Sequence, residues 1–300
     1  MTESAKQPNP ATLSPEAAKV LQTKKLTGRQ RLKPWIKLLN ELAVFDEIED
    51  QVRGRFKSRM ILCIVAAVVL AIATVIVGAN IRGPAWLVLL LLAAAAVAGA
   101  VVFGIKWSRL KDIDLDNEFR LLLIPFLDAI AEDVDPSGRI VLDLDLAGMT
   151  EAKKKYEKPL DPGRWKKVTE MFYEDPWCKV EAPLMGGNRL LLSIENQYTA
   201  NKREWKNPRG KSKSKTKWKK LVVVSAGLAP NSETLGVDAD RPVDGKVKVS
   251  EKGDARIVRV VHKFKYESVG ERPEESLPPD DLVGVFFQVG SMLVQAKAGS

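Results

Sequence analysis

The longest apolar runs in the chain are two neighbouring segments, residues 60–79 and residues 85–105. They read MILCIVAAVVLAIATVIVGA and AWLVLLLLAAAAVAGAVVFGI, and neither contains a charged residue. Each run is about 20 residues long, roughly 30 Å as a helix, which is the thickness of a bilayer's hydrocarbon core. Only residues 80–84 separate them. The pattern therefore predicts a transmembrane helical hairpin over residues 60–105, inserted in a lipid bilayer. Two buried helices of a soluble protein are the alternative, but these runs leave no polar face for water.

Basic residues gather at one side of this predicted hairpin. The positive residues next to the two runs are Arg53, Arg55, Lys57 and Arg59 before the first, and Lys106, Arg109 and Lys111 after the second. The connecting turn offers only Arg82. Positive charge concentrates in short cytoplasmic flanks. We therefore expect a multi-pass protein of the plasma (inner) membrane with both termini in the cytoplasm.

Small residues recur at helix-contact spacing in both runs. They are Ala67, Ala71 and Gly78 in the first run, and Ala96, Ala100 and Gly104 in the second. Such rows let two helix backbones approach closely in lipid, either within one hairpin or between copies in a homo-oligomer. Neither run contains an ionisable residue, which argues against a transporter or a proton relay.

Two different segments precede the hairpin. Residues 1–28 are polar and contain Pro8, Pro10 and Pro15, so we expect a mostly disordered tail. Residues 29–59 carry apolar side chains at helical spacing, which predicts an amphipathic cytoplasmic helix. Its apolar face would contact either the membrane surface, another copy, or the chain's own C-terminal domain; we favour the last.

Residues 106–300 form a cytoplasmic domain whose pattern is mostly that of strands. A helix is expected over residues 119–134 and another over residues 282–295. Strands are expected over residues 139–146, 177–182, 189–197, 219–225, 246–250 and 256–266. The predicted fold class is thus a two-helix transmembrane hairpin plus a cytoplasmic α+β domain with a predominantly antiparallel β-sheet.

Charge is unevenly distributed along the chain. The 300 residues include 47 Lys and Arg against 38 Asp and Glu, a net charge of +9. Residues 202–220 alone hold ten basic residues and one acid, Glu204. The basic ones are Lys202, Arg203, Lys206, Arg209, Lys211, Lys213, Lys215, Lys217, Lys219 and Lys220. Asn207-Pro208-Arg209-Gly210 fits a type I turn.

The basic segment is therefore interpreted as a β-hairpin with Trp205 and Trp218 along its length. Lysines at every second position from 211 to 219 would line one face of an extended arm. Such a face would bind a polyanion, either anionic lipid head groups or the phosphates of nucleic acid. A solvated, partly disordered loop is the alternative.

Signals for catalysis are weak. Asp143 and Asp145 alternate on one face of a predicted strand; they would suit a cation or acid–base chemistry, but an exposed strand face explains them better. His262 lies on an apolar strand face, and the cysteines, Cys63 and Cys178, fit no metal pattern. We expect no cofactor and no catalytic metal.

The preferred hypothesis is a membrane-anchored, non-enzymatic scaffold or interaction protein whose basic hairpin engages anionic lipid or another polyanion. The first alternative is an oligomerising membrane effector or pore controlled by the cytoplasmic domain. A membrane-bound enzyme built around His262 and the carboxylates is the second. The sequence does not identify a protein partner.

Overall fold

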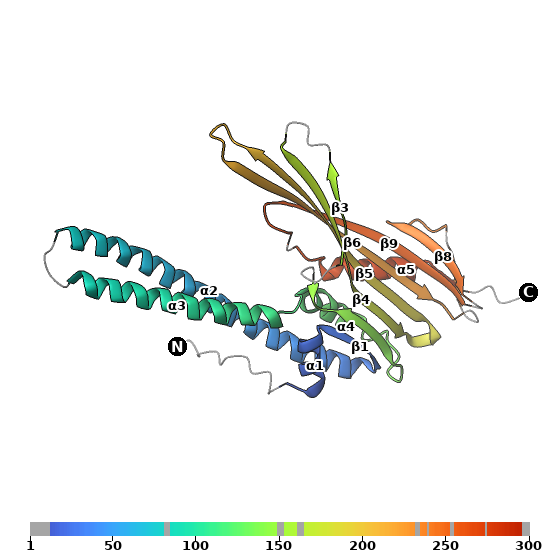
Figure 1. Ribbon diagram of the computed structural model, residues 1–300. Helices are drawn as coiled ribbons and strands as arrows, with labels where there is room; N and C mark the ends of the chain where they lie inside the picture. Colours follow the sequence, from blue (N-terminus) through green and yellow to red (C-terminus); the bar gives the residue numbers. More distant parts are fainter. Residues whose placement is uncertain are drawn as a thin grey trace, which may run out of the picture. The chain divides into compact units, whose positions relative to one another are not determined.

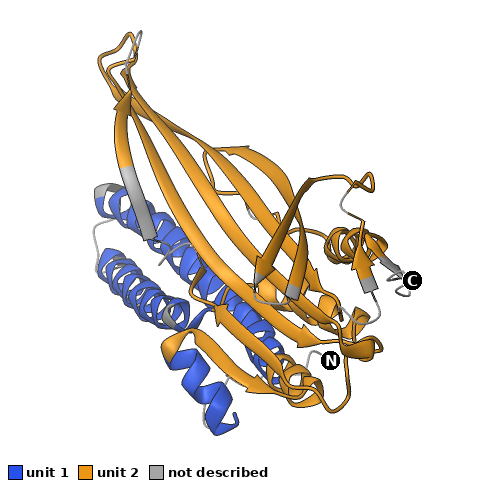
Figure 2. Cartoon of the chain, turned by 90° about the vertical axis from the view of Figure 1, so that its right-hand side faces the viewer, with its two compact units in different colours: residues 1–22, 41–114 blue, residues 23–40, 115–300 orange. Residues whose placement is uncertain are grey.

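The computed structural model of the protein describes residues 13–80, 85–148, 153–160, 165–231, 235–238, 240–252, 255–273 and 275–295. The chain divides into two compact units, coloured separately in Figure 2. One unit comprises residues 1–22 and 41–114, and the other comprises residues 23–40 and 115–300.

Two long apolar helices dominate the first unit (Figure 1). They are α2 (Leu32–Asn80) and α3 (Ala85–Ile113). Both are long and apolar enough to cross a bilayer, and the most apolar stretch of each is only 0% and 6% buried within the chain. The helices pair antiparallel, because Cys63 faces Gly99 and Met60 faces Gly104. The prediction of two long apolar helices is confirmed, and the expected amphipathic helix is the first part of α2.

The expected disordered tail is wrong for residues 15–28. Helix α1 (Pro15–Thr23) is followed by strand β1 (Lys25–Gln30). Ala17, Val20 and Leu21 of α1 are buried. The hydroxyl of Ser14 accepts a bond from the amide of Ala17 and donates to a carboxylate oxygen of Glu41 at 2.9 Å. Three apolar side chains and a capping residue thus order a segment whose composition looked polar. Residues 1–12 lie outside the described part of the chain.

The second unit is built on an antiparallel β-sheet. Its order is β1-β2-β4-β5-β6-β9-β8, with β3 paired to β4, and β7 pairs separately with β10. The remaining strands are β2 (Ile140–Asp145), β3 (Lys153–Leu160), β4 (Lys167–Pro183), β5 (Arg189–Lys206), β6 (Ser212–Ala229), β7 (Leu235–Val237), β8 (Lys246–Lys252), β9 (Ala255–Val269) and β10 (Leu293–Gln295). All pairings in these sheets are antiparallel, as expected.

One face of the large sheet carries the hydrophobic core. Helical segments η2 (Phe119–Leu123), α4 (Ile124–Ala129) and α5 (Pro279–Ser291) supply its other half. The rings of Phe126 and Phe286 meet edge to face, with centroids 6.4 Å apart. We call the sheet face towards these helices the inner face and the opposite one the outer face. The expected helix over residues 282–295 ends early, because residues 293–295 pair with β7.

Residues 23–40 complete this sheet unit from the N-terminal side of the chain. Strand β1 pairs along the whole of β2, from Lys25 opposite Asp145 to Gln30 opposite Ile140. The Trp35 side chain is 1% exposed, and its Nε1–H donates to the carbonyl oxygen of Ile140 at 3.0 Å. A Cβ on Gly28 would lie 3.2 Å from the Trp35 ring, so glycine lets the strand approach the indole closely.

Candidate functional site

The basic segment forms a continuous hairpin of β5 and β6 that stays paired from Arg189–Ala229 out to Lys206–Ser212 (Figure 1). At its tip the Asn207 carbonyl accepts from the Gly210 amide, and the Asn207 side chain accepts from the Lys211 amide at 2.8 Å. Gly210 has φ 76°, which glycine adopts without strain. The segment is therefore a hairpin with a turn of the expected residues.

Strand alternation sorts the basic residues onto two faces. Lys213, Lys215, Lys217 and Lys219 all point to the outer face, where Lys215 lies opposite Arg203. Each of these side chains is exposed or half-exposed. Lys202 and Lys206 alternate onto the other face, and Lys202 pairs with Glu204 at 2.9 Å. Arg209 and Lys211 are exposed in the turn.

The two tryptophans of the segment lie on opposite faces. Trp205 stands on the outer face opposite Lys213, and its ring centroid lies 5.2 Å from that of Trp165. The Arg203 guanidinium is 5.7 Å from the centre of the Trp165 ring. Trp218 points to the inner side instead, 6.3 Å from the ring of Tyr173. The outer face near the tip thus combines indole rings with cations.

Lys220 was included among the polyanion-binding residues, and the structure contradicts that assignment. Its side chain is only 3% exposed on the inner face, and its Nζ lies 2.5 Å from Oε1 of Glu118. The same ammonium donates to the carbonyl oxygen of Glu275 at 2.9 Å. Position 220 has the opposite parity to Lys219, so the run of basic residues crosses from the surface into the core at this point.

The basic surface extends beyond the hairpin onto β9 and β8. Lys265 lies opposite Leu221, and Lys263 lies opposite Val223, so both share the outer face with the hairpin lysines. Arg259, Lys246 and Lys248 continue the same face through the β8–β9 pairing. Sequence analysis missed these five residues, although their alternation within each strand was visible. Their common face emerges only from the pairing register.

The outer face also carries acidic residues, among them Glu195 of β5, which lies opposite Val223 in the same row as Lys263. Glu267 of β9 lies on the outer face and pairs with Lys217 at 2.7 Å and with Lys219 at 3.3 Å. Hydrogen bonds from these two lysines hold the pKa of Glu267 below its usual value. Lys213, Lys215, Lys263 and Lys265 are exposed beside it. We call the outer-face cations of β5, β6, β8 and β9 the basic face. Its members are Arg203, Lys213, Lys215, Lys217, Lys219, Lys246, Lys248, Arg259, Lys263 and Lys265.

Behind the basic face lies a buried polar cluster. Glu118 accepts from Asn196 Nδ2 at 3.0 Å as well as from Lys220. Asp175 lies opposite Asn196 in the β4–β5 pairing and is 4% exposed. Among the described residues, neither Oδ2 of Asp175 nor Oδ1 of Asn196 has a hydrogen-bond partner. Burial, helped by the charges of Asp116 and Glu118, raises the pKa of Asp175 to about 7. The cluster is a packed part of the core.

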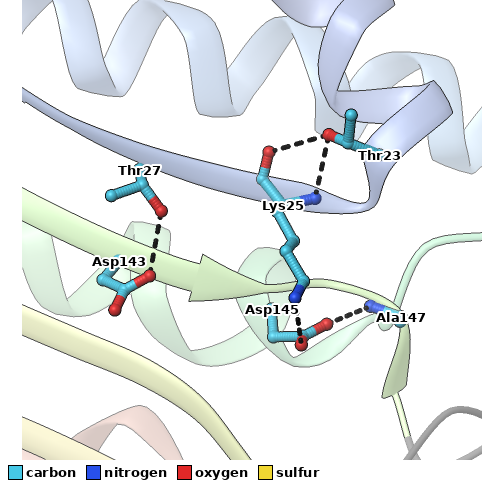
Figure 3. Close-up of polar contacts among 6 residues, drawn as sticks. All are labelled: Thr23, Lys25, Thr27, Asp143, Asp145 and Ala147. Carbon is cyan, nitrogen blue, oxygen red and sulfur yellow. Dashed lines mark hydrogen bonds and ion pairs between the residues drawn. The ribbon is translucent and has the colours of Figure 1, made fainter.

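The other carboxylates singled out in the sequence are engaged in strand pairing. Figure 3 shows Asp143 accepting from the Thr27 hydroxyl at 2.9 Å and Asp145 facing the Lys25 ammonium at 3.9 Å. His262 contacts Oε1 of Gln288 through Nε2 at 2.9 Å. Among the described residues, the side-chain hydrogen bond of His262 is thus with an amide group and not with a carboxylate.

The small residues of the apolar helices are only partly in contact positions. Ala67, Ala96, Ala100 and Gly104 are half-buried. A Cβ on Gly104 would lie 3.4 Å from the Met60 sulfur. Ala71 and Gly78 are exposed, although a Cβ on Gly78 would lie 3.9 Å from the Cβ of Trp86 on α3. Residues 63, 67, 70 and 74 of α2 are half-buried, and this 3-4 spacing leaves Ala71 beside the contact stripe.

A second acidic group lies in the first unit, on the part of α2 that precedes its apolar run and just after the end of α3. Carboxylate oxygens of Asp46, Glu49 and Asp114 lie within 4.8 Å of one another, a grouping that could hold a metal ion. The Arg53 guanidinium, however, donates to Asp50 at 2.6 Å and to Asp114. Burial raises the pKa of Glu49 to about 8 despite the opposing effect of Arg53. Because Arg53 already pairs with two of the nearby carboxylates and the Glu49 carboxyl is neutral near pH 7, this group is better described as an ion-pair cluster than as a metal site.

Comparisons with known proteins add no identification to this geometry: no family model, no curated protein and no solved structure matches the chain.

Proposed function

We propose that the protein is a membrane-anchored scaffold or interaction protein whose basic face binds the anionic head groups of a cytoplasmic leaflet. The observation that carries this proposal is the basic face itself. It gathers cations from four strands, and the carboxylate of Glu267 on β9 is paired with two lysines. Each basic residue near an anionic leaflet contributes about 1 kcal/mol.

Membrane insertion is supported by the exposed apolar surface of α2 and α3. Valine, isoleucine and leucine side chains along both helices are about half exposed or more, including Leu62, Val75 and Leu91. Contiguous apolar surface of this length is unfavourable in water and suits lipid. The basic residues Arg55, Arg59, Lys106 and Arg109 flank the apolar stretches, which favours cytoplasmic termini.

Lipid is favoured over nucleic acid because of the tryptophans and the anchor. Trp165 and Trp205 adjoin the cations at the tip, and indole rings favour the head-group layer of a membrane. The sheet unit is also covalently joined to the two apolar helices, so a membrane surface is always close by. Lysines would also contact nucleic acid phosphates, so duplex DNA is the competing polyanion against which lipid binding must be compared.

The test compares two variants that each lose two positive charges, one on the basic face and one elsewhere on the chain as a control. Full-length protein in phosphatidylcholine nanodiscs carries either Lys213→Gln with Lys215→Gln, or Lys33→Gln with Lys37→Gln. All four lysines are exposed. Loss of two face charges should weaken binding to phosphatidylglycerol vesicles roughly 30-fold, from about 1 kcal/mol per residue. The control pair should stay within about twofold. Equal losses of vesicle binding in both variants would show that binding depends only on the net charge of the protein, and would reject the basic face as the binding surface.

The oligomerising effector or pore is a second candidate, favoured by one observation. Ala71 is exposed on α2 and lies outside the half-buried stripe of residues 63, 67, 70 and 74. Small residues permit close approach by another helix. Defined oligomers in detergent, reduced by Ala71→Leu, together with ion leakage from liposomes would support this candidate. A strict monomer that leaks no ions would reject it.

A further inference from the structure

A hollow of about 310 Å³ opens at the basic end of the α2–α3 pair. Its lining residues are Asp50, Arg53, Gly54 and Lys57 from α2, and Trp107 and Lys111 from α3. Lys57 precedes the first apolar run by three residues, and Trp107 follows the second by two. At a rise of 1.5 Å per residue, both lie within about 5 Å of the apolar boundary along their helices. In a membrane this is the depth of lipid head groups.

The free positive charge of the hollow comes from two lysines. Arg53 is held by Asp50 at 2.6 Å and by Asp114, so its charge is largely compensated. Lys57 and Lys111 are exposed, and neither has an ion-pair partner among the described residues. Asp50, the only acid in the lining, is bonded to Arg53. An anion in the hollow would therefore meet two ammonium groups that no carboxylate of the described residues pairs with.

The shape of the hollow suits a phosphate group with an attached apolar chain. A Cβ on Gly54 would have no atom within 4 Å, so there is open space beside that residue. The Trp107 indole offers both an apolar ring and an N–H donor, a combination typical of the head-group layer. Above the hollow, the exposed apolar sides of α2 and α3 could lie along acyl chains.

We propose that this hollow binds one anionic phospholipid, with the head-group phosphate between Lys57 and Lys111 and beside Trp107. The proposal rests on the membrane insertion proposed above, but it does not depend on the basic face, which belongs to other residues. Basic hollows between membrane helices on the cytoplasmic side commonly bind anionic head groups. A free phosphate ion would use the same contacts, so the experiment must separate the two.

The experiment measures lipid retention by native mass spectrometry of the full-length protein in detergent. The protein is incubated with equal amounts of dioleoylphosphatidylglycerol and dioleoylphosphatidylcholine. The test variant is Lys57→Gln with Lys111→Gln. The control is Arg55→Gln with Arg109→Gln, two exposed cations on the same helices that do not line the hollow. The wild type should retain one phosphatidylglycerol in preference to phosphatidylcholine. The test variant should retain roughly 30-fold less, and the control should stay within about twofold of wild type.

Two results would overturn the lipid site. Equal losses in both variants would show that net charge alone retains the lipid. Displacement of phosphatidylglycerol by an equal concentration of inorganic phosphate would assign the hollow to a free anion. Failure of membrane insertion would look different: alkaline carbonate would then extract the wild type from membranes, and no variant would retain lipid preferentially.

Discussion

The ammonium of Lys220 lies 2.5 Å from Oε1 of Glu118, and both side chains are nearly buried in the core of the sheet unit. The neighbouring Lys219 is exposed, 3.3 Å from the carboxylate of Glu267. Two adjacent lysines thus form ion pairs, one buried and one exposed, whose loss should affect the free energy of unfolding very differently. Removing one partner of a buried pair leaves an uncompensated charge in a medium of low polarity, whereas an exposed pair contributes little.

Lys220→Met should therefore destabilise the protein strongly, by about 3–5 kcal/mol. For a unit of this size the melting temperature should fall by about 10 °C. Lys219→Met is the matched control and should change stability by less than about 0.5 kcal/mol. Thermal unfolding of the detergent-solubilised full-length protein, followed by tryptophan fluorescence, measures both. Similar small shifts for the two variants would contradict the buried pair.

Asp175 should make stability depend on pH. Burial raises its pKa from 3.8 to about 7 in the folded protein, so the folded state binds a proton more tightly than the unfolded state. The stability associated with this proton is fully present below about pH 4 and is lost as pH rises through about 7. Asp175→Asn keeps a neutral side chain at every pH and can donate to Oδ1 of Asn196.

The melting temperature of Asp175→Asn should thus match wild type near pH 4 and exceed it at pH 8, by roughly 5 °C. The comparison is made between variants at each pH, because Glu49 also titrates in this range with a pKa of about 8. Asp143→Asn, which changes an exposed carboxylate of the same sheet, serves as control. A difference between Asp175→Asn and wild type that does not grow with pH would refute the assignment.

Local periodicity was enough to predict much of this fold. The two apolar runs predicted α2 and α3, and alternating residues located the core strands of the sheet. The hairpin turn was also readable, because Asn207 and Gly210 occupy positions that a turn requires. These features depend on residues close together in the sequence.

Features that depend on long-range pairing were not predictable in the same way. Strand β1 is paired with residues 110 to 120 positions away, so its six residues carried no sufficient signal alone. Lys220 looked like one more member of a basic run, because its partner Glu118 lies 102 residues earlier. The contributions of Lys263 and Lys265 to the basic face became visible only through their register with β6.

Trp35 should be essential for the stability of the sheet unit, although it precedes the apolar helices. Trp35→Ala should cost about 3–5 kcal/mol, because it empties a buried site and removes the bond to the Ile140 carbonyl. Trp35→Phe keeps most of the volume and should cost less. Thermal unfolding ranks the two variants. A melting temperature for Trp35→Ala equal to wild type would show that residues 23–40 do not belong to the unit.

The β9 lysines should contribute to polyanion binding as the hairpin lysines do. Lys263→Gln with Lys265→Gln should weaken binding to phosphatidylglycerol vesicles by the same order as Lys213→Gln with Lys215→Gln, because both pairs are exposed on one face. Vesicle flotation at fixed salt compares the two pairs. Full binding by the β9 variant would restrict the surface to the hairpin alone.

The central claim is that the basic face binds an anionic lipid surface. The most direct measurement is flotation of the full-length protein, held in phosphatidylcholine nanodiscs, with phosphatidylglycerol vesicles, phosphatidylcholine vesicles and duplex DNA over a series of salt concentrations. The account predicts salt-sensitive binding to phosphatidylglycerol vesicles, no binding to phosphatidylcholine vesicles, and weaker binding to DNA. Binding to none of the three at low salt, or binding that Lys213→Gln with Lys215→Gln leaves unchanged, would contradict it.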